Sequence, residues 1–238
     1  MRLLDLTLAT AAENLALDEA LLLAAEEADA GPVLRLWEQP TLAVVLGAGG
    51  SVAIDVNRAA CEADGVPILR RASGGGTVLL GPGCLCFSLV LGYDHAPGLN
   101  EIPASNRYVL GRILRAVRGA VPDARLEGTS DLAVTGRKFS GNAQQRKRRY
   151  LLHHGTLLCG FDLGRMARYL NLPERQPDYR RGRSHDEFVT NLGVPVDEVK
   201  RLLVAEWCPE GELQAWPWAT VRRLVEEKYG REEWNRRR

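Results

Sequence analysis

An arginine pair followed by three glycines is the first feature of the sequence that could bind a charged ligand. Residues 69–83 read LRRASGGGTVLLGPG, so Arg70, Arg71 and Ser73 stand directly before Gly74–Gly76. Backbone without Cβ atoms admits a ligand closely, and its exposed N–H groups can form an anion-binding nest. A guanidinium beside it suits phosphate or carboxylate. The stretch lacks the Lys-Ser/Thr pair that ends a P-loop and the glycine spacing of a dinucleotide-binding fingerprint. The alternative to a ligand-binding loop is a flexible turn or a β-bulge.

A lysine among small and polar residues is the second such feature. In GRKFSGNAQ, Lys138 is followed by Phe139, Ser140, Gly141 and Asn142, neighbours that suit the floor of a cleft better than an outer edge. An ammonium group held there could stabilise negative charge on a transferring phosphoryl or acyl group. A solvated surface lysine after a hairpin is the alternative.

Two adjacent histidines form the third feature, in HHGTLL. Neighbouring residues on a strand point to opposite faces, so His153 and His154 are a poor pair of metal ligands. We expect one of them to pack or hydrogen-bond in the interior, and Gly155 to admit a ligand or a neighbouring strand.

The composition predicts one soluble domain over residues 1–238. A formal charge of +1 gives no overall field for nucleic acid or an acidic membrane, and no apolar run is long enough for a membrane helix. The five cysteines lack zinc-type spacing, and no signal peptide is recognised, so a cytoplasmic location is expected. The basic stretch 144–150, QQRKRRY, is interpreted as a solvated hairpin face rather than a nucleic-acid site.

Periodicity predicts an α/β (α+β) fold with a mixed, largely antiparallel sheet flanked by helices. Helices are expected from a cap at Thr10 to Ala24, from about Ile102 to Val121, and near Thr220–Tyr229 at the end. A tight turn at Thr135–Gly136 predicts a hairpin. Other segments are strand-like at 33–39, 41–47, 66–72, 76–81, 84–92 and 150–163, helical at 55–65, and mostly helical after Gly164 apart from an Arg- and Pro-rich loop at 173–185.

Several segments together resemble one known family. RRASGGGT, SDLAVTGRKFSGNAQ and HHGTLLCGFDL, in this order and spacing, resemble the lipoate–protein ligase A family of the biotin/lipoate ligase superfamily. ENLALDEALL near the start and LVEEKYGREEWN near the end agree with it, so the resemblance covers almost the whole chain. It implies the class II synthetase-like catalytic domain of that superfamily, with residues 212–238 as its helical C-terminal end and no separate accessory domain.

The resemblance implies an ATP-dependent enzyme. Members activate lipoate or octanoate to an acyl-adenylate and pass the acyl group to a lysine of a lipoyl-domain protein, such as a glycine cleavage H protein or the E2 subunit of a 2-oxoacid dehydrogenase. Lys138 matches the catalytic lysine, Mg²⁺ is expected with ATP, and Asp131 is the nearest acidic candidate for a metal ligand. The matching substrate- and adenylate-binding residues are Arg71, Ser73, Gly75, Gly76, Thr77, Ser140, Gly141, His154, Gly155 and Thr156.

The sequence also departs from the family pattern and leaves alternatives open. VLLGPGCLC places Cys84 and Cys86 where many ligases have polar residues. The candidates for an apolar slot that would hold the acyl chain are Val78, Leu79, Leu80 and Phe139. Without an accessory domain, either a separate subunit completes the adenylation step or the enzyme has a reduced activity. One alternative is an ATP-independent octanoyltransferase with a cysteine nucleophile, for which Cys84, Cys86 and Cys159 are conceivable. Another is a catalytically silent protein that binds lipoyl domains. The basic stretch, if it lay beside Lys138, would steer an acidic acceptor.

Overall fold

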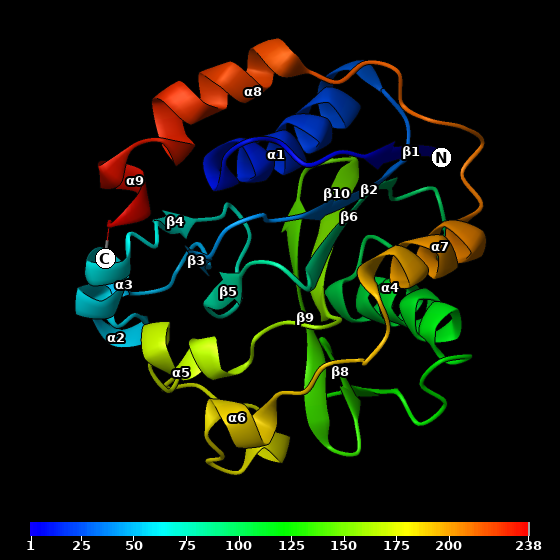
Figure 1. Ribbon diagram of the computed structural model, residues 1–238. Coiled ribbons are helices and arrows are strands. Elements are labelled where there is room, and N and C mark those ends of the chain that lie inside the picture. Colours follow the sequence, from blue (N-terminus) through cyan, green and yellow to red (C-terminus); the bar gives the residue numbers. More distant parts are fainter. Residues whose placement is uncertain (238) are drawn as a thin grey trace.

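Two β-sheets, covered by helices, make up the computed structural model, which describes residues 1–237 (Figure 1). The large sheet has the order β1-β2-β6-β10-β9-β8-β7 and is antiparallel except where β1 lies beside β2. The small sheet has the order β4-β3-β5. The predicted mixed, largely antiparallel architecture is therefore confirmed, although its strands form two sheets instead of one. The strands are β1 (Arg2–Asp5), β2 (Val33–Glu38), β3 (Ala43–Leu46), β4 (Ile68–Arg70), β5 (Val78–Leu80), β6 (Cys84–Gly92), β7 (Arg125–Glu127), β8 (Asp131–Val134), β9 (Arg137–Arg146) and β10 (Tyr150–Leu158).

The first helix begins at the predicted cap. The backbone N–H of Glu13 donates to Thr10 Oγ1 and the Thr10 N–H donates to the Glu13 carboxylate, which completes a capping box. The helix continues to Ala28, beyond the predicted end at Ala24. The helices are α1 (Ala11–Ala28), α2 (Val52–Asp55), α3 (Arg58–Asp64), α4 (Ile102–Val117), α5 (Gly164–Tyr169), η1 (Asp178–Arg180), α6 (His185–Phe188), α7 (Val196–Trp207), α8 (Trp218–Leu224), η2 (Val225–Tyr229) and α9 (Glu232–Asn235).

Two helix boundaries differ from the predictions. Helix α4 ends at Val117 rather than Val121, because Gly119 is a poor helix former and Pro122 lacks an N–H. The helix expected at 220–229 corresponds to α8 and the π-helical turn η2, but it is followed by α9 and is therefore not the last.

The large sheet separates two apolar cores. Along β6, Cys84, Cys86 and Val90 belong to one cluster, and Leu85 and Phe87 belong to the other. Helix α1 covers the first face, while α4 and α7 cover the second (Figure 1). Burial on both faces explains why β6 is apolar apart from Ser88 instead of alternating with polar residues.

Two turns bring the glycine loop and the Lys138 hairpin to the same region. The hairpin between β8 and β9 turns at Thr135 and Gly136, with φ of 50° and 75°, as predicted. Strand β10 pairs with β9 so that His154 lies opposite Ala143. The loop between β4 and β5 packs its Gly75 carbonyl against Gly47, where a Cβ would overlap it.

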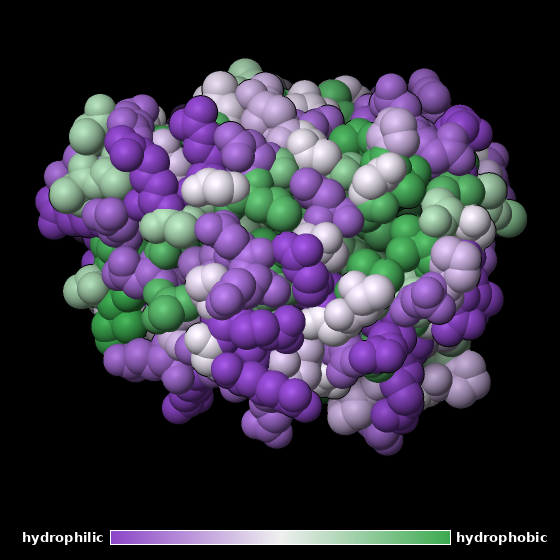
Figure 2. Space-filling view, turned by 60° about the horizontal axis from the view of Figure 1, so that its bottom comes forward, coloured by the Kyte–Doolittle hydropathy of each residue, from purple (hydrophilic) through white to green (hydrophobic). Residues whose placement is uncertain are grey.

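The exterior shows no broad apolar face from the side drawn in Figure 2. Hydrophobic areas there are broken up by hydrophilic side chains, and some lie in depressions between them (Figure 2). In residues 1–237, no helix combines the length and hydropathy needed to cross a membrane.

Candidate active site

Two adjoining cavities meet at Lys138. The smaller cavity, of about 190 Å³, has a mostly apolar wall, and the larger cavity is about 440 Å³. Lys138, Asp131, Thr77 and Thr156 line both. The apolar wall of the smaller cavity is formed by Leu15, Trp37, Val45, Val78, Leu80, Cys86 and Phe87.

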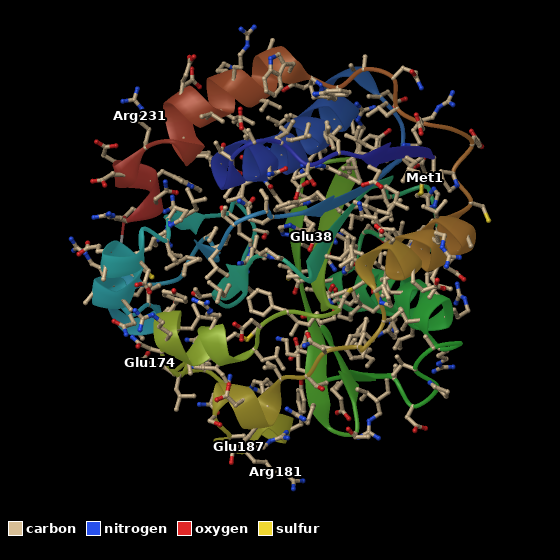
Figure 3. The ribbon with its side chains drawn as sticks, viewed as in Figure 1. Met1, Glu38, Glu174, Arg181, Glu187 and Arg231 are labelled. Carbon is tan, nitrogen blue, oxygen red and sulfur yellow. The ribbon has the colours of Figure 1, made fainter. Side chains whose placement is uncertain are left out.

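Lys138 is held by a carboxylate in this structure. Its Nζ lies 2.7 Å from Asp131 Oδ1, and Tyr179 OH donates to Asp131 Oδ2 at 2.9 Å. Burial, followed by the charge of Asp131, raises the pKa of Tyr179, so this hydroxyl stays a donor at neutral pH. Tyr179 belongs to the segment 173–188, whose outer side is marked in Figure 3 by the labelled Glu174 at the lower left and by Arg181 and Glu187 at the lower edge.

The glycine loop is organised by Arg71 from within. Its guanidinium donates to the carbonyls of Val45, Gly74 and Gly76 at 3.3, 2.6 and 2.8 Å, and to Ser73 Oγ at 3.0 Å. Burial lowers the pKa of Arg71 to about 10, which keeps it charged at neutral pH. Arg71 lines the smaller cavity, but its donors bind the loop and the neighbouring strand β3, and thereby fix the loop's shape.

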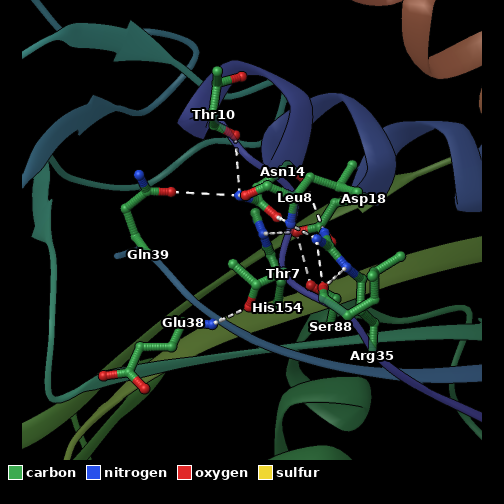
Figure 4. Close-up of polar contacts among 11 residues, drawn as sticks. Thr7, Leu8, Thr10, Asn14, Asp18, Arg35, Glu38, Gln39, Ser88 and His154 are labelled. Carbon is green, nitrogen blue, oxygen red and sulfur yellow. Dashed lines mark hydrogen bonds and ion pairs between the residues drawn. The ribbon is translucent and has the colours of Figure 1, made fainter. Parts of the chain in front are cut away.

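A buried polar network lies behind the smaller cavity (Figure 4). Arg35 Nη1 lies 2.6 Å from Asp18 Oδ1, and Ser88 Oγ donates to Asp18 Oδ2 at 2.8 Å. His154 Nδ1 is 3.8 Å from Asp18 Oδ2, and its Nε2 is 2.6 Å from Ser73 Oγ. Burial acts to raise the pKa of Asp18, but Arg35 and His154 outweigh it, so the pKa is lowered. The network fixes the ring of His154 at the cavity wall.

His153 points to the opposite face of β10 and stacks on Phe87, as expected for adjacent strand residues. It is fully buried, and neither ring nitrogen has a hydrogen-bond partner. Burial lowers its pKa to about 3. His153 is therefore neutral in the folded protein and belongs to the core rather than to the site.

This buried histidine predicts a pH-dependent stability. The unfolded chain binds a proton near pH 6.5, so stability is lost as the pH falls from there toward 3, by about 1.4 kcal/mol per unit. At pH 5 the expected loss is about 2 kcal/mol relative to pH 8. Urea unfolding of wild type and His153→Leu at both pH values measures it, and the variant should lack this contribution. An equal pH dependence in the two proteins would contradict the assignment.

Most of the sequence-predicted site residues line the two cavities. The exception is Ser73, which contacts His154 and Arg71 behind the wall. Leu80 faces the smaller cavity, Leu79 and Phe139 line the larger one, and Val78 lines both. The residues that the structure places at either cavity are Arg71, Gly75, Gly76, Thr77, Asp131, Lys138, Ser140, Gly141, His154, Gly155 and Thr156.

The sequence analysis missed the residues that support the site. Asp18 and Arg35 carry charges within the apolar runs of α1 and β2, and such interruptions were the available signal. Tyr179 and Arg180 lie in the Arg- and Pro-rich loop noted at 173–185, but its sequence indicated no role for them, because the segment reaches the site only through the fold.

The basic hairpin does not lie beside Lys138. Arg146 stands at the other end of β9, eight positions after Lys138, and at about 3.4 Å per residue this separation is roughly 27 Å. Arg149 is also bound to the backbone carbonyl of Glu26. The expectation that this patch steers an acceptor toward a neighbouring lysine is therefore wrong in its geometry.

The part of the chain that the structure describes offers few metal ligands. In residues 1–237, no three His, Cys, Asp or Glu side chains come together in a way that could hold a metal ion. Asp131, the candidate ligand, has one oxygen on Lys138 and the other on Tyr179.

Comparisons with known sequences agree on one family. The family described as "Lipoyl protein ligase A/B catalytic domain" matches residues 10–207. A Mycoplasma pneumoniae protein named "Probable lipoate-protein ligase A" is 32% identical over 189 residues, which are 76% of this chain and 54% of the relative. The chain thus spans about half the length of the curated ligases it matches. "Octanoyltransferase LipM" of Carboxydothermus hydrogenoformans is 29% identical, with 98% of this chain and 97% of the relative covered.

Solved structures share the fold over the whole chain. A bi-partite lipoate protein ligase studied with its E2 lipoyl domain, from Thermoplasma acidophilum, has a TM-score of 0.84 at 25% identity, covering 99% of this chain and 95% of that chain. A lipoate-protein ligase A bound with ATP has a TM-score of 0.85 at 25% identity, covering 99% of this chain and 98% of that chain.

Proposed function

The chain belongs to the family of lipoyl protein ligase A/B catalytic domains, and from this premise we propose that it is a lipoate–protein ligase. It activates lipoate or octanoate with ATP and transfers the acyl group to a lysine of a lipoyl-domain protein. The observation that carries the proposal is the position of Lys138 between a mostly apolar cavity and a larger one lined by several basic side chains. This arrangement suits an acyl chain on one side and phosphates on the other.

In the first step the acid's carboxylate oxygen attacks the α-phosphorus of ATP. The new oxygen–phosphorus bond forms as the bond to the β-phosphate bridge breaks, and pyrophosphate leaves with the electron pair. Both reactants are anions, so alignment and charge neutralisation dominate the barrier. Lys138 supplies the positive charge where the two cavities meet. Asp131 orients the ammonium before substrate arrives.

In the second step the neutral amine of the acceptor lysine attacks the acyl carbonyl. An amide forms, AMP leaves with the electrons of the cleaved acyl–oxygen bond, and the amine releases a proton. Lys138 again faces the oxygen atoms on which negative charge develops.

Mg²⁺ enters such a reaction on the phosphates of ATP, usually with one or two protein carboxylates. Asp55 and Asp131 are the carboxylates that line the larger cavity. The Ser51 N–H and the Thr77 hydroxyl both donate to the same carboxylate oxygen of Asp55, Oδ2. We propose Asp55 as the principal metal-facing carboxylate, because Asp131 is occupied by Lys138 and Tyr179. The ion would neutralise phosphate charge.

The proposed acceptor is a lipoyl domain of the H-protein or E2 type. The archaeal ligase that shares this fold is bi-partite and was studied with its E2 lipoyl domain. By analogy, we propose that a separate accessory polypeptide takes part in activation, and that the complex acts in the cytoplasm.

An octanoyltransferase is the second candidate, since LipM matches this chain over nearly its whole length. Cys86 lines the smaller cavity and is the cysteine best placed to act as nucleophile. Burial and the neighbouring Cys84 raise its pKa well above the usual range, and burial raises that of Cys159 to about 12. Both shifts disfavour the thiolate that such catalysis needs, which favours the ligase.

Two assays separate the candidate functions. Lipoate-dependent pyrophosphate release from ATP and Mg²⁺, retained in Cys86→Ser, supports the ligase; it is measured with and without an accessory subunit. Octanoyl transfer from acyl carrier protein without ATP, lost in Cys86→Ser, supports the transferase instead. Binding of a lipoyl domain with no turnover in either assay would identify a silent homologue.

A further inference from the structure

The segment 173–188 forms one wall of the larger cavity and is fixed to the β8–β9 hairpin. Tyr179 binds Asp131, and Arg183 Nη2 donates to the carbonyl of Gly136 at 2.9 Å. The rings of Tyr179 and Phe188 lie 5.1 Å apart and pack the middle of the segment against its C-terminal end. The cavity wall is therefore defined before any ligand binds.

Arg180 is an unusual residue in this wall. It is only 4% exposed, its Nε donates to the Arg183 carbonyl at 3.0 Å, and its guanidinium lies 4.7 Å from the Phe188 ring. Its Nη2 is buried without a hydrogen-bond partner, and none of the ion pairs found in residues 1–237 includes Arg180. A buried charge that lacks a counter-ion is costly.

The surroundings increase this cost. Burial, followed by the nearby charge of Arg183, lowers the pKa of Arg180. The cavity that it lines also contains the positively charged side chains of Lys138 and Arg175. Against them stand two carboxylates, Asp55 and Asp131, and the latter is already paired with Lys138. The wall thus holds a guanidinium with an unpaired donor, and the cavity has an excess of positive charge that favours an anion.

We propose that Arg180 is a phosphate-binding residue, with its free Nη2 directed to a phosphoanion of the acyl donor in the larger cavity. The identity of that donor rests on the proposed function: for a ligase it is the pyrophosphate portion of ATP. If acyl carrier protein were the donor, the same site would take the phosphate of its phosphopantetheine arm. A guanidinium suits either source, because its planar fork matches phosphate oxygens.

One internal alternative exists. Gln176 Oε1 is also buried without a partner and lines the same cavity, so a small movement could pair it with Arg180. In that case Arg180 would stabilise the empty protein and contribute nothing to phosphate binding. Binding and stability measurements on the same variants separate the two roles.

The experiment compares Arg180→Gln with Arg181→Gln in the full chain. Arg181 adjoins Arg180 but is exposed and lies at the outer edge of the molecule, which makes it a matched control (Figure 3). Calorimetry measures binding of inorganic pyrophosphate, ATP and pantetheine 4′-phosphate, with lipoate as a ligand of the other cavity. Arg180→Gln is expected to weaken binding of the cognate phosphate about 10- to 100-fold and to leave lipoate unchanged. Arg180→Lys keeps the positive charge but not the planar guanidinium fork, so its phosphate affinity should lie between those of wild type and Arg180→Gln. It replaces Arg180→Gln as the test variant if Arg180→Gln does not fold.

The outcomes separate this inference from the proposed function. Equal phosphate affinities in wild type and Arg180→Gln overturn the inference, and a lower Tm of the unliganded variant would then identify pairing with Gln176. Pyrophosphate release by wild type and Arg180→Gln at equal KM for ATP also overturns it, while the ligase function stands. Arg180-dependent binding of pantetheine 4′-phosphate, without pyrophosphate release by wild type either alone or with an accessory subunit, supports the inference and rejects the ligase.

Discussion

Lys138→Ala is expected to reduce lipoate-dependent pyrophosphate release by about 10²- to 10³-fold, the usual cost of removing one preorganised charge-stabilising group. The ammonium lies where the two cavities meet and is held by Asp131 at 2.7 Å. It acts most strongly on charge that develops during the reaction, so kcat should fall more than KM for lipoate rises. Steady-state pyrophosphate release measures both constants.

Lys147→Ala is the matched control for this substitution. Lys147 follows the far end of the same strand, and its recorded contacts there are through the backbone, with its carbonyl accepting from Tyr93 OH and its N–H donating to Tyr150 O. Its removal should leave kcat unchanged. Wild-type turnover in Lys138→Ala would place the charge-neutralising group elsewhere, and equal losses in both variants would indicate a general effect on folding.

Gly47→Ala is expected to destabilise the protein and to abolish most activity through the glycine loop. A Cβ at this position would overlap the carbonyl oxygen of Gly75 and lie 2.9 Å from its carbonyl carbon. Backbone atoms cannot move aside as a flexible side chain can, so the loop must shift. Overpacking of this kind costs about 1–3 kcal/mol, which lowers Tm by roughly 2–12 °C in a domain of this size. Thermal unfolding and pyrophosphate release measure the two effects.

Gly49→Ala separates crowding from a general intolerance of alanine in this turn. A Cβ at Gly49 would meet no atom within 4 Å. The control should keep wild-type Tm and activity. If Gly47→Ala behaves in the same way, the close approach of the two loops does not hold in solution.

Local patterns predicted the elements well. The capping box at Thr10 and Glu13 requires only residues three positions apart, and the Thr135–Gly136 turn requires only two residues that tolerate positive φ. The capping box and the turn each involve only a few consecutive residues, so the local sequence is enough to predict them. The edge strand β1 was missed because its four residues acquire a strand conformation only through pairing with β2.

The partners of charged groups could not be predicted in the same way. The donors of Arg71 are occupied by backbone carbonyls of its own loop and of β3, and this depends on how the loop folds back. The Asp131 carboxylate accepts a hydrogen bond from Tyr179, which lies 48 residues later in the chain, and no local pattern predicts such a contact. The residue types that suit phosphate were recognisable, but their assignment to binding, support or the core required the tertiary structure.

The internal bonding of the glycine loop has a thermodynamic consequence for substrate capture. Gly74–Gly76 would be highly mobile as free chain, and ordering such residues costs about 1–2 kcal/mol each. Arg71 already holds this loop through two of its carbonyls, so much of that entropy is lost on folding rather than on binding. More of the interaction energy between loop and ligand is then available as affinity. A glycine-rich wall can thus give close approach to a substrate without the entropic penalty that glycine normally brings.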